Sequence, residues 1–242
     1  MTSTISSGTE AALLARIRST LDRIDAKTVE LRLAVDSGMR FVPPPLRNRV
    51  AAGWPDFCAL MRRIWDNLTT ILSNMGSPYR LYTTANAWSD RVGVPVSGQV
   101  QTAEAGLLLV DDNWDGDAAD AYRQMLPLQK AALDKIKSTI TDGVSTALMT
   151  VAAGIVAFWA GLVGAATALA VGILGALSST ATIIGMPAAP FIACGAAATA
   201  CVSMIGAAEV LKALCSTANS TLRQKFDDTG FHGGHWPPAV RG

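Results

Sequence analysis

Charged side chains are scarce in this 242-residue chain: they make up 16% of it, against about 25% in a typical soluble domain. Aromatic residues are scarcer still, at 6%, although half of all residues are hydrophobic. The apolar content therefore consists mainly of Ala, Leu, Val and Ile, which suits helices better than a β-sandwich. No strand-like alternation of apolar and polar residues occurs in the first 142 residues. The composition predicts an all-α protein.

Residue patterns that carry enzyme chemistry are also missing. The sequence holds no nucleophile elbow, phosphate-binding loop or dinucleotide-binding motif. Its two histidines, His232 and His235, lie in a Gly- and Pro-rich run that we interpret as a flexible tail and not a metal site. The acidic residues from Asp111 to Asp120 lack the spacing of a calcium loop, so we expect them to cap a helix. We therefore predict a non-enzymatic protein with no catalytic residue, no metal and no cofactor.

Charge and cysteine usage limit the partners and the compartment. The formal net charge is +1 and acidic and basic residues interleave, so we expect no nucleic-acid partner. The N-terminal residues lack the basic start and apolar core of a secretory signal, so we expect no Sec signal peptide. The cysteines form no Cys-x-x-Cys pair, which favours reduced, buried thiols, with a disulfide between helices as the alternative. The four are Cys58, Cys194, Cys201 and Cys215.

A seam of apolar residues with heptad spacing runs along the first predicted helix, residues 9–36. Its members lie three and four residues apart, so this helix should lie lengthwise along a partner helix. Gly38 follows as a helix stop, because Gly accepts the left-handed conformation. The partner-helix seam consists of Leu14, Ile17, Leu21, Ile24, Thr28, Leu31 and Val35.

Proline and glycine runs divide the rest of the first 142 residues. Residues 41–45 contain three prolines and predict a stiff connector. The run from Gly93 to Gly98 should interrupt a helix, and Pro127 should kink another. We predict four further helices in this region. The first begins at residue 46 or at residue 55 and ends at residue 75, and the others cover residues 78–92, 99–112 and 117–141.

No charged side chain occurs between Asp142 and Glu209, a run of 66 residues. A membrane-spanning helix needs about 20 apolar residues, so this run has room for two. The residues between Ser178 and Pro190 should break it, which gives helices over 145–177 and 188–214. Together these helices predict an apolar hairpin of the transmembrane type.

Small residues and flanking charges refine this prediction. Lysines and arginines flank the uncharged run at both ends, whereas the loop between its helices has none, so the positive-inside tendency places both ends in the cytoplasm. Small residues on one side of each helix should let the two backbones approach closely in lipid. These membrane-hairpin packing residues are Gly161, Gly164, Ala168, Gly172 and Gly175 on the first helix and Gly195 and Ala198 on the second.

The run from Trp114 to Tyr122 resembles the motif of the WXG100 (ESX-like) helical hairpins. That family has Trp-x-Gly at the turn between two helices, followed by small residues and an aromatic residue. The resemblance covers residues 78–141, and Trp88 lies where related hairpins carry another Trp. The residues that carry it at the turn are Trp114, Gly116, Ala118, Ala119 and Tyr122, with Ala121 between the last two.

The resemblance implies a substrate of type VII secretion that forms helical bundles as a dimer. It implies export without an N-terminal signal and a helical protein partner, either a second copy or a WXG100-like heterodimer partner. The family's export motif, Tyr-x-x-x-Asp or Glu, is missing after Tyr79, Tyr82 and Tyr122. Export with a partner that carries the motif, or retention in the membrane, would account for its absence.

These observations together predict an elongated all-α bundle with a WxG hairpin and a C-terminal apolar hairpin. We expect residues 1–142 to form the N-terminal bundle, 143–215 the membrane hairpin and 216–242 a flexible tail. The predicted function is that of a non-enzymatic, WXG100-like protein of the membrane or cell envelope that inserts into lipid and permeabilises it as an oligomer. The alternatives are a soluble scaffold or chaperone whose Ala-rich hairpin is core, and an accessory or immunity membrane protein of a secreted toxin.

Overall fold

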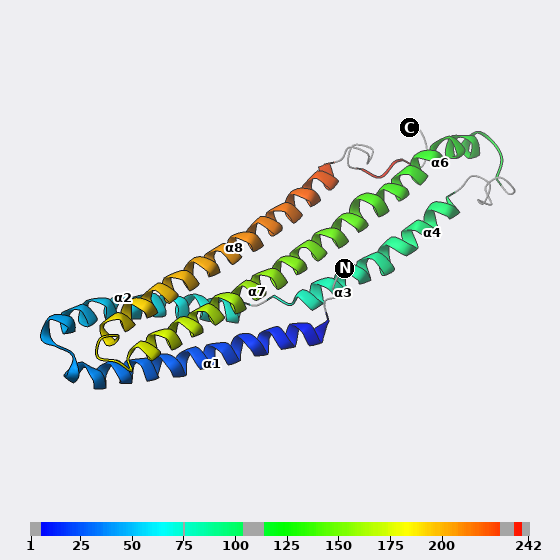
Figure 1. Ribbon diagram of the computed structural model, residues 1–242. Coiled ribbons are helices and arrows are strands. Elements are labelled where there is room, and N and C mark those ends of the chain that lie inside the picture. The colour runs from blue at the N-terminus through cyan, green and yellow to red at the C-terminus, as the bar shows by residue number, and fades with distance from the viewer. Residues whose placement is uncertain (1–5, 75, 104–113, 228–234, 239–242) are drawn as a thin grey trace. The chain divides into compact units, whose positions relative to one another are not determined.

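The computed structural model describes residues 6–74, 76–103, 114–227 and 235–238, and in these residues the chain is helical with no strand (Figure 1). The prediction of an all-α protein is therefore confirmed. The long helices are α1 (Ser7–Gly38), α2 (Pro44–Ser73), α3 (Pro78–Trp88), α4 (Val94–Thr102), α6 (Asp117–Lys135), α7 (Asp142–Ser179) and α8 (Ala189–Asp227). Short 3₁₀ or π segments join some of them: η1 (Met39–Phe41), η2 (Ser89–Gly93), η4 (Ile136–Thr141) and η5 (Met186–Ala188).

Local sequence accounts for the helix starts. The Ser6 hydroxyl accepts a hydrogen bond of 3.1 Å from the backbone N–H of Thr9, which caps α1. α2 begins directly at the prolines, because a proline in the first turn gives up an N–H that has no helical partner anyway. The predicted connector of residues 41–45 is therefore shorter than expected, and Pro55 lies inside α2 instead of starting it.

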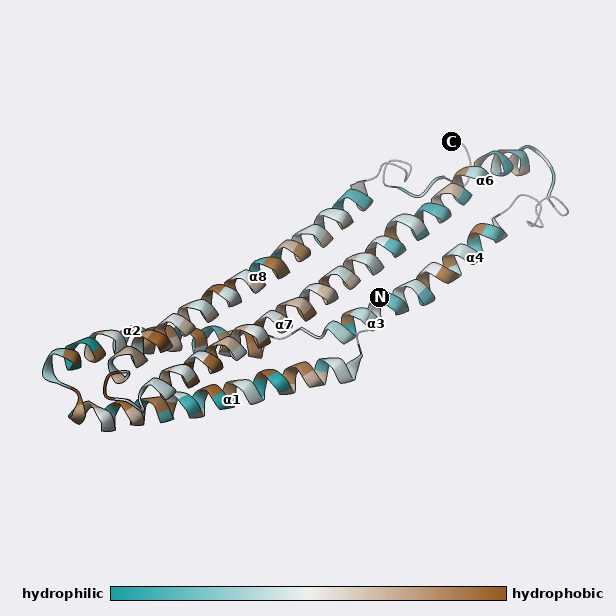
Figure 2. Cartoon of the chain, viewed as in Figure 1, coloured by the Kyte–Doolittle hydropathy of each residue, from teal (hydrophilic) through white to brown (hydrophobic). Residues whose placement is uncertain are grey.

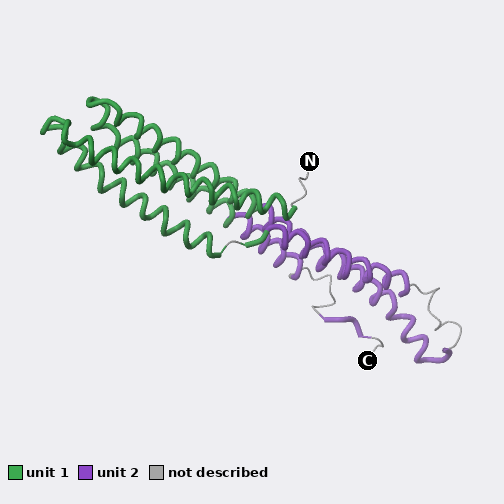
Figure 3. Tube along the Cα trace, turned by 90° about the horizontal axis from the view of Figure 1, so that it is seen from below, with its two compact units in different colours: residues 1–77, 154–212 green, residues 78–153, 213–242 purple. Residues whose placement is uncertain are grey.

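The chain divides into two compact units that do not follow the predicted domain boundaries (Figure 3). Unit 1 comprises residues 1–77 and 154–212, and unit 2 comprises residues 78–153 and 213–242. The boundaries differ because α7 and α8 each contribute residues to both units. The predicted flexible tail is wrong for residues 216–227, which belong to α8.

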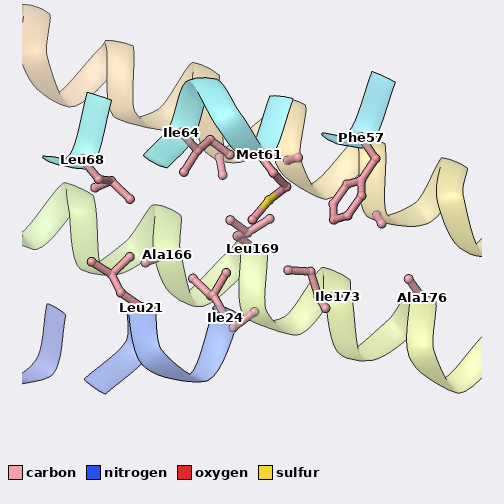
Figure 4. Close-up of a cluster of buried hydrophobic side chains, with 14 of the residues drawn as sticks. Leu21, Ile24, Phe57, Met61, Ile64, Leu68, Ala166, Leu169, Ile173 and Ala176 are labelled. Carbon is pink, nitrogen blue, oxygen red and sulfur yellow. The ribbon is translucent and has the colours of Figure 1, made fainter. Parts of the chain in front are cut away.

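Unit 1 is built from α1, α2 and the parts of α7 and α8 within it, and one apolar core joins all four. In Figure 4, side chains of α1 and α2 converge on Leu169 and Ile173 of α7 from opposite sides. The largest fully buried side chain is Trp159, also on α7. α7 is therefore the central helix of this core.

The partner-helix seam of α1 lies in this core. Leu14 is partly buried against it, and Thr28 is half-buried and donates a hydrogen bond to the carbonyl of Ile24. The prediction of a helix packed lengthwise is confirmed, but the partner is the chain's own α2 and α7. The five buried members are Ile17, Leu21, Ile24, Leu31 and Val35.

Unit 2 contains a helical hairpin in which α4 packs against α6 and η2 packs against η4. Gly93 lies against Thr141, where an added Cβ would come within 2.9 Å of the Thr141 Cγ2. The buried Ser145 hydroxyl donates a 3.1 Å hydrogen bond to the carbonyl of Ala85, which ties the start of α7 to α3.

The predicted interruption from Gly93 to Gly98 is wrong, because the chain stays helical through it. A π-helical turn, η2, precedes Pro95, which lies in the first turn of α4. The wider turn accommodates the proline that an unbroken α-helix would not tolerate. The predicted helix over 99–112 lies mostly outside the described residues, and its described part ends at Thr102.

Gly172 sets the distance between α7 and α8, and a matched pair of alanine variants tests this. An added Cβ at Gly172 would overlap the Cβ of Ala196, whereas at Gly164 nothing lies within 4 Å. We expect Gly172→Ala to lower the free energy of unfolding by about 1–3 kcal/mol through overpacking. Gly164→Ala should raise it by about 0.5–1 kcal/mol, because alanine favours the helix. Urea unfolding followed by circular dichroism measures both, and equal effects would contradict the close contact.

Candidate membrane-interaction surface

α8 turns its smallest residues toward the core of unit 1. Ala189, Ala193, Ala197 and Ala200 are completely buried there and lie four, four and three residues apart. Small side chains at this spacing allow two helix backbones to approach closely. At Gly161 of α7, an added Cβ would lie only 2.7 Å from the Cβ of Ala207. The α7–α8 contact is therefore made mainly by glycine and alanine.

The larger apolar residues of α8 consequently face outward. Val202 is 69% exposed, and an added Cβ at Gly195 or Gly206 would meet nothing within 4 Å. An isoleucine, valine or phenylalanine gains about 1.5–3 kcal/mol when it leaves water completely, so this face favours contact with lipid or another apolar surface. The outer face of α8 comprises Phe191, Ile192, Val202, Ile205 and Val210.

Two helical stretches are long and apolar enough to cross a membrane: residues 117–179, which include α7, and 186–226, which include α8. Figure 2 shows few strongly hydrophilic residues along most of α7 and α8. In the most apolar part of each stretch, 44% of the residues are buried in the first and 17% in the second. A core helix of a soluble protein also has this length and composition. α7 is thus more deeply buried than α8, whose outer side is uncovered.

The predicted membrane-hairpin packing residues divide between these two environments. Gly161 and Gly172 lie at the α7–α8 contact, and Gly175 lies near Ile192, where an added Cβ would be 3.9 Å from its Cγ2. The prediction that the others also pack between the helices is wrong. These others, Gly164, Ala168, Gly195 and Ala198, are exposed, as is Gly175. Gly195 and Ala198 lie outside the contact because the buried alanines of α8, from Ala189 to Ala200, are on another side of that helix.

A groove separates part of α2 from α8 in unit 1. It has a volume of about 320 Å³, and Ile64, Met204 and Ile205 supply apolar walls. Arg63 and Asn67 add polar groups to its lining. The groove shows that α2 covers α8 less completely than α1 and α2 cover α7.

The Trp-x-Gly residues lie at the start of α6 in unit 2. Gly116 has a φ of +105°, a conformation that L side chains rarely adopt, and its carbonyl accepts a hydrogen bond from the N–H of Asp120. The rings of Trp114 and Tyr122 lie 5.8 Å apart, centroid to centroid. Arg123 donates a 3.1 Å hydrogen bond to the Trp114 carbonyl. The motif thus forms a defined turn into a helix.

The other motif residues differ in their surroundings. Ala119 is completely buried, whereas Ala118 is exposed and does not contribute to close helix packing as predicted. Trp114 is 41% exposed, so it lies on the turn without being enclosed by both helices. Trp88 ends α3, and its indole N–H is buried without a hydrogen-bond partner. The acidic residues Asp111 and Asp112 of the predicted cap lie outside the described residues.

Residues that could bind a metal ion do not gather in the described part of the chain. No three residues of the types His, Cys, Asp and Glu come together there. The cysteines are free thiols; Cys58 is exposed, so the prediction of buried thiols is wrong for it, and the other three are half-buried. His235 is described, whereas His232 is not. The exposed apolar surface of unit 1 is the candidate functional site.

Comparison with protein-family models, with curated proteins and with solved structures finds no match to this chain.

Proposed function

We propose that this chain is a non-enzymatic, WXG100-like protein associated with type VII secretion that acts at a membrane through its α7–α8 hairpin. One observation carries the proposal: 66 residues without a charge form a helical hairpin whose outer face on α8 exposes large apolar side chains. The Trp-x-Gly turn, with its positive-φ glycine and its Trp–Tyr ring contact, supports the family part of the proposal. Lipid, and a second copy or a helical partner, are the proposed binding partners.

Insertion requires the hairpin to leave α1 and α2. α1 carries exposed charged residues such as Arg18, Asp22 and Arg23, and a charge at the centre of a bilayer costs about 2.5–3.5 kcal/mol or more. These helices therefore stay outside the lipid while α7 and α8 enter it. In water, α1 and α2 cover the residues of α7 that would otherwise be exposed. Unit 1 is then a stored form, and the inserted hairpin is the active form.

Vesicle flotation tests the proposal with the full-length chain. We expect the protein to float with phosphatidylcholine–phosphatidylglycerol vesicles, to resist extraction with alkaline carbonate and to release an entrapped dye. Flotation that carbonate reverses, without dye release, would contradict insertion and favour the soluble scaffold, in which α7 is simply core. The secretion part is tested separately, by detecting the protein in culture filtrate with and without an intact type VII system.

A further inference from the structure

One end of unit 1 combines exposed apolar residues from two distant parts of the sequence. The α1–α2 connection and the α7–α8 loop meet there, as the blue and yellow ends in Figure 1 show. Gly38 lies against Met186, and an added Cβ at Gly53 would be 3.2 Å from the Cβ of Pro190. The apolar tip, as we call it, consists of Phe41, Ile183, Ile184, Phe191 and Ile192, all of them exposed.

Packing within unit 1 leaves the apolar side chains of this tip largely exposed to solvent. Ile184 is 91% exposed and Phe41 is 64% exposed. Leu46, Pro187 and Phe191 line a hollow of about 700 Å³ together with Ile184. Because the first turns of α2 and the α7–α8 loop with the start of α8 both line it, the hollow depends on the folded form of unit 1.

Three arginines lie beside the apolar tip. The guanidinium of Arg40 lies over the ring of Phe41, 5.2 Å from its centroid, and Arg49 lines the hollow. Arg47 donates hydrogen bonds to the carbonyls of Val42 and Arg40, which fixes its side chain along the connection. The tip arginines are Arg40, Arg47 and Arg49.

No acidic residue occurs in either segment that builds the tip. Residues 37–55 and 143–208 contain no Asp or Glu. The preceding acid, Asp36, forms an ion pair of 3.9 Å with Arg32 on α1. The tip therefore presents three positive charges around an apolar centre, which complements an anionic bilayer: guanidinium groups bind lipid phosphate, and the apolar side chains enter below the headgroups.

We propose that the apolar tip and its arginines are the surface by which unit 1 first docks on anionic lipid, before the hairpin inserts. This inference rests on the proposed membrane function and adds the end of the molecule and the class of lipid. The α7–α8 loop is the part of the hairpin that must cross the bilayer, and the arginines hold it at the headgroups until it does.

Vesicle-binding measurements test whether the tip and its arginines bind anionic lipid. Each basic residue near an anionic surface contributes about 1 kcal/mol, or about a five-fold change in partitioning. Replacing all three, in R40Q/R47Q/R49Q, should weaken binding to phosphatidylglycerol-containing vesicles about 100-fold. Added salt should weaken the binding of the unsubstituted protein, and vesicles of phosphatidylcholine alone should bind it less. I184S should also weaken binding, by about ten-fold, because one apolar side chain no longer leaves water.

Two further variants control for net charge and for folding. R16Q/R18Q/R23Q removes the same charge from exposed positions in the first half of α1, none of which lines the hollow at the tip, and should bind within a few-fold of the unsubstituted protein. R40K/R47K/R49K keeps the charge and should retain most of the binding. Circular dichroism and the urea midpoint show whether the glutamine variant still folds; if it does not, I184S and the lysine variant decide.

Four results would overturn the docking role alone. The first is equal binding to vesicles with and without phosphatidylglycerol. The second is a glutamine variant that binds as well as the unsubstituted protein, and the third is an equal loss in the α1 control; both leave membrane insertion standing. The fourth is equally tight, tip-dependent binding to soluble polyglutamate, which would assign the tip to an acidic protein. Failure of the unsubstituted protein to bind any vesicle would instead remove the membrane function and the docking role together.

Discussion

A disulfide between α2 and α8 should abolish membrane insertion and dye release. In a G53C/P190C variant whose four native cysteines are replaced by alanine, the new cysteines can bond, because the Cβ atoms of these positions would lie 3.2 Å apart. Disulfide-bonded cysteines have Cβ atoms about 3.5–4.5 Å apart, so a small adjustment suffices. The bond holds the start of α8 on α2. The hairpin then cannot separate from α1 and α2 and enter the lipid. Dye release measured with the oxidised protein should fall to the background level.

The same protein is its own control. Reduction should restore dye release to the level of the cysteine-free parent, which should itself not respond to oxidant. Mass spectrometry of the oxidised sample establishes that the bond has formed. Full dye release by the bonded protein would show that α8 acts without leaving α2, and the proposed stored form would then be wrong. Docking at the tip does not need the hairpin to leave, so vesicle binding of the oxidised protein should persist.

Replacing Trp159 by alanine should have the largest effect on stability. Its side chain is 2% exposed and belongs to the unit 1 core, and a buried Trp or Phe replaced by alanine costs about 3–5 kcal/mol. We expect a fall of that size in the free energy of unfolding, measured by urea unfolding followed by circular dichroism. If the hairpin leaves the core before insertion, this variant should also release dye faster than the unsubstituted protein.

Val171 provides a matched control on the same helix. Its side chain is 64% exposed, so V171A should change the free energy of unfolding by no more than about 0.5 kcal/mol. A similar loss in the two variants would mean that the buried face of α7 is misassigned. Slower dye release by W159A than by V171A would argue against departure of the hairpin from the core.

The regular parts of the fold were predictable because they depend on local periodicity. The spacing of Ile17, Leu21 and Ile24 predicts a buried seam whatever lies opposite, and the structure buries these residues. The absence of charge between Asp142 and Glu209 predicts two apolar helices in the same way. What the spacing does not specify is the partner of each face, and the partner of the α1 seam proved to be the same chain.

The surface of α8 was harder to predict because its pattern is the reverse of the usual one. Apolar size normally marks the buried side of a helix, but here alanine faces the core and Phe191, Val202 and Ile205 face outward. The sequence did contain a sign of the buried side of α8, in the regularly spaced alanines at positions 189, 193, 197 and 200. The choice of Gly195 and Ala198 as contact residues missed it, since both are small but lie on another side.

The apolar tip could not be predicted from the sequence, for a different reason. Arg40 and Ile184 are far apart in the chain, and only the folded arrangement of the four helices brings their segments to one end. The sequence indicated that the α7–α8 loop has no basic residue of its own, which remains correct. The basic residues beside that loop come from the α1–α2 connection.

The glycine–alanine contact between α7 and α8 has a consequence for transfer between solvents. Gly161 against Ala207 and Gly172 against Ala196 bring the backbones together by dispersion forces and bury few large apolar groups. This helix–helix contact loses little of its stabilisation when water is replaced by hydrocarbon. The contacts of α1 and α2, in contrast, depend on the hydrophobic effect and therefore on water. The two helices can therefore change surroundings as a preassembled pair, with their mutual geometry kept from one solvent to the other.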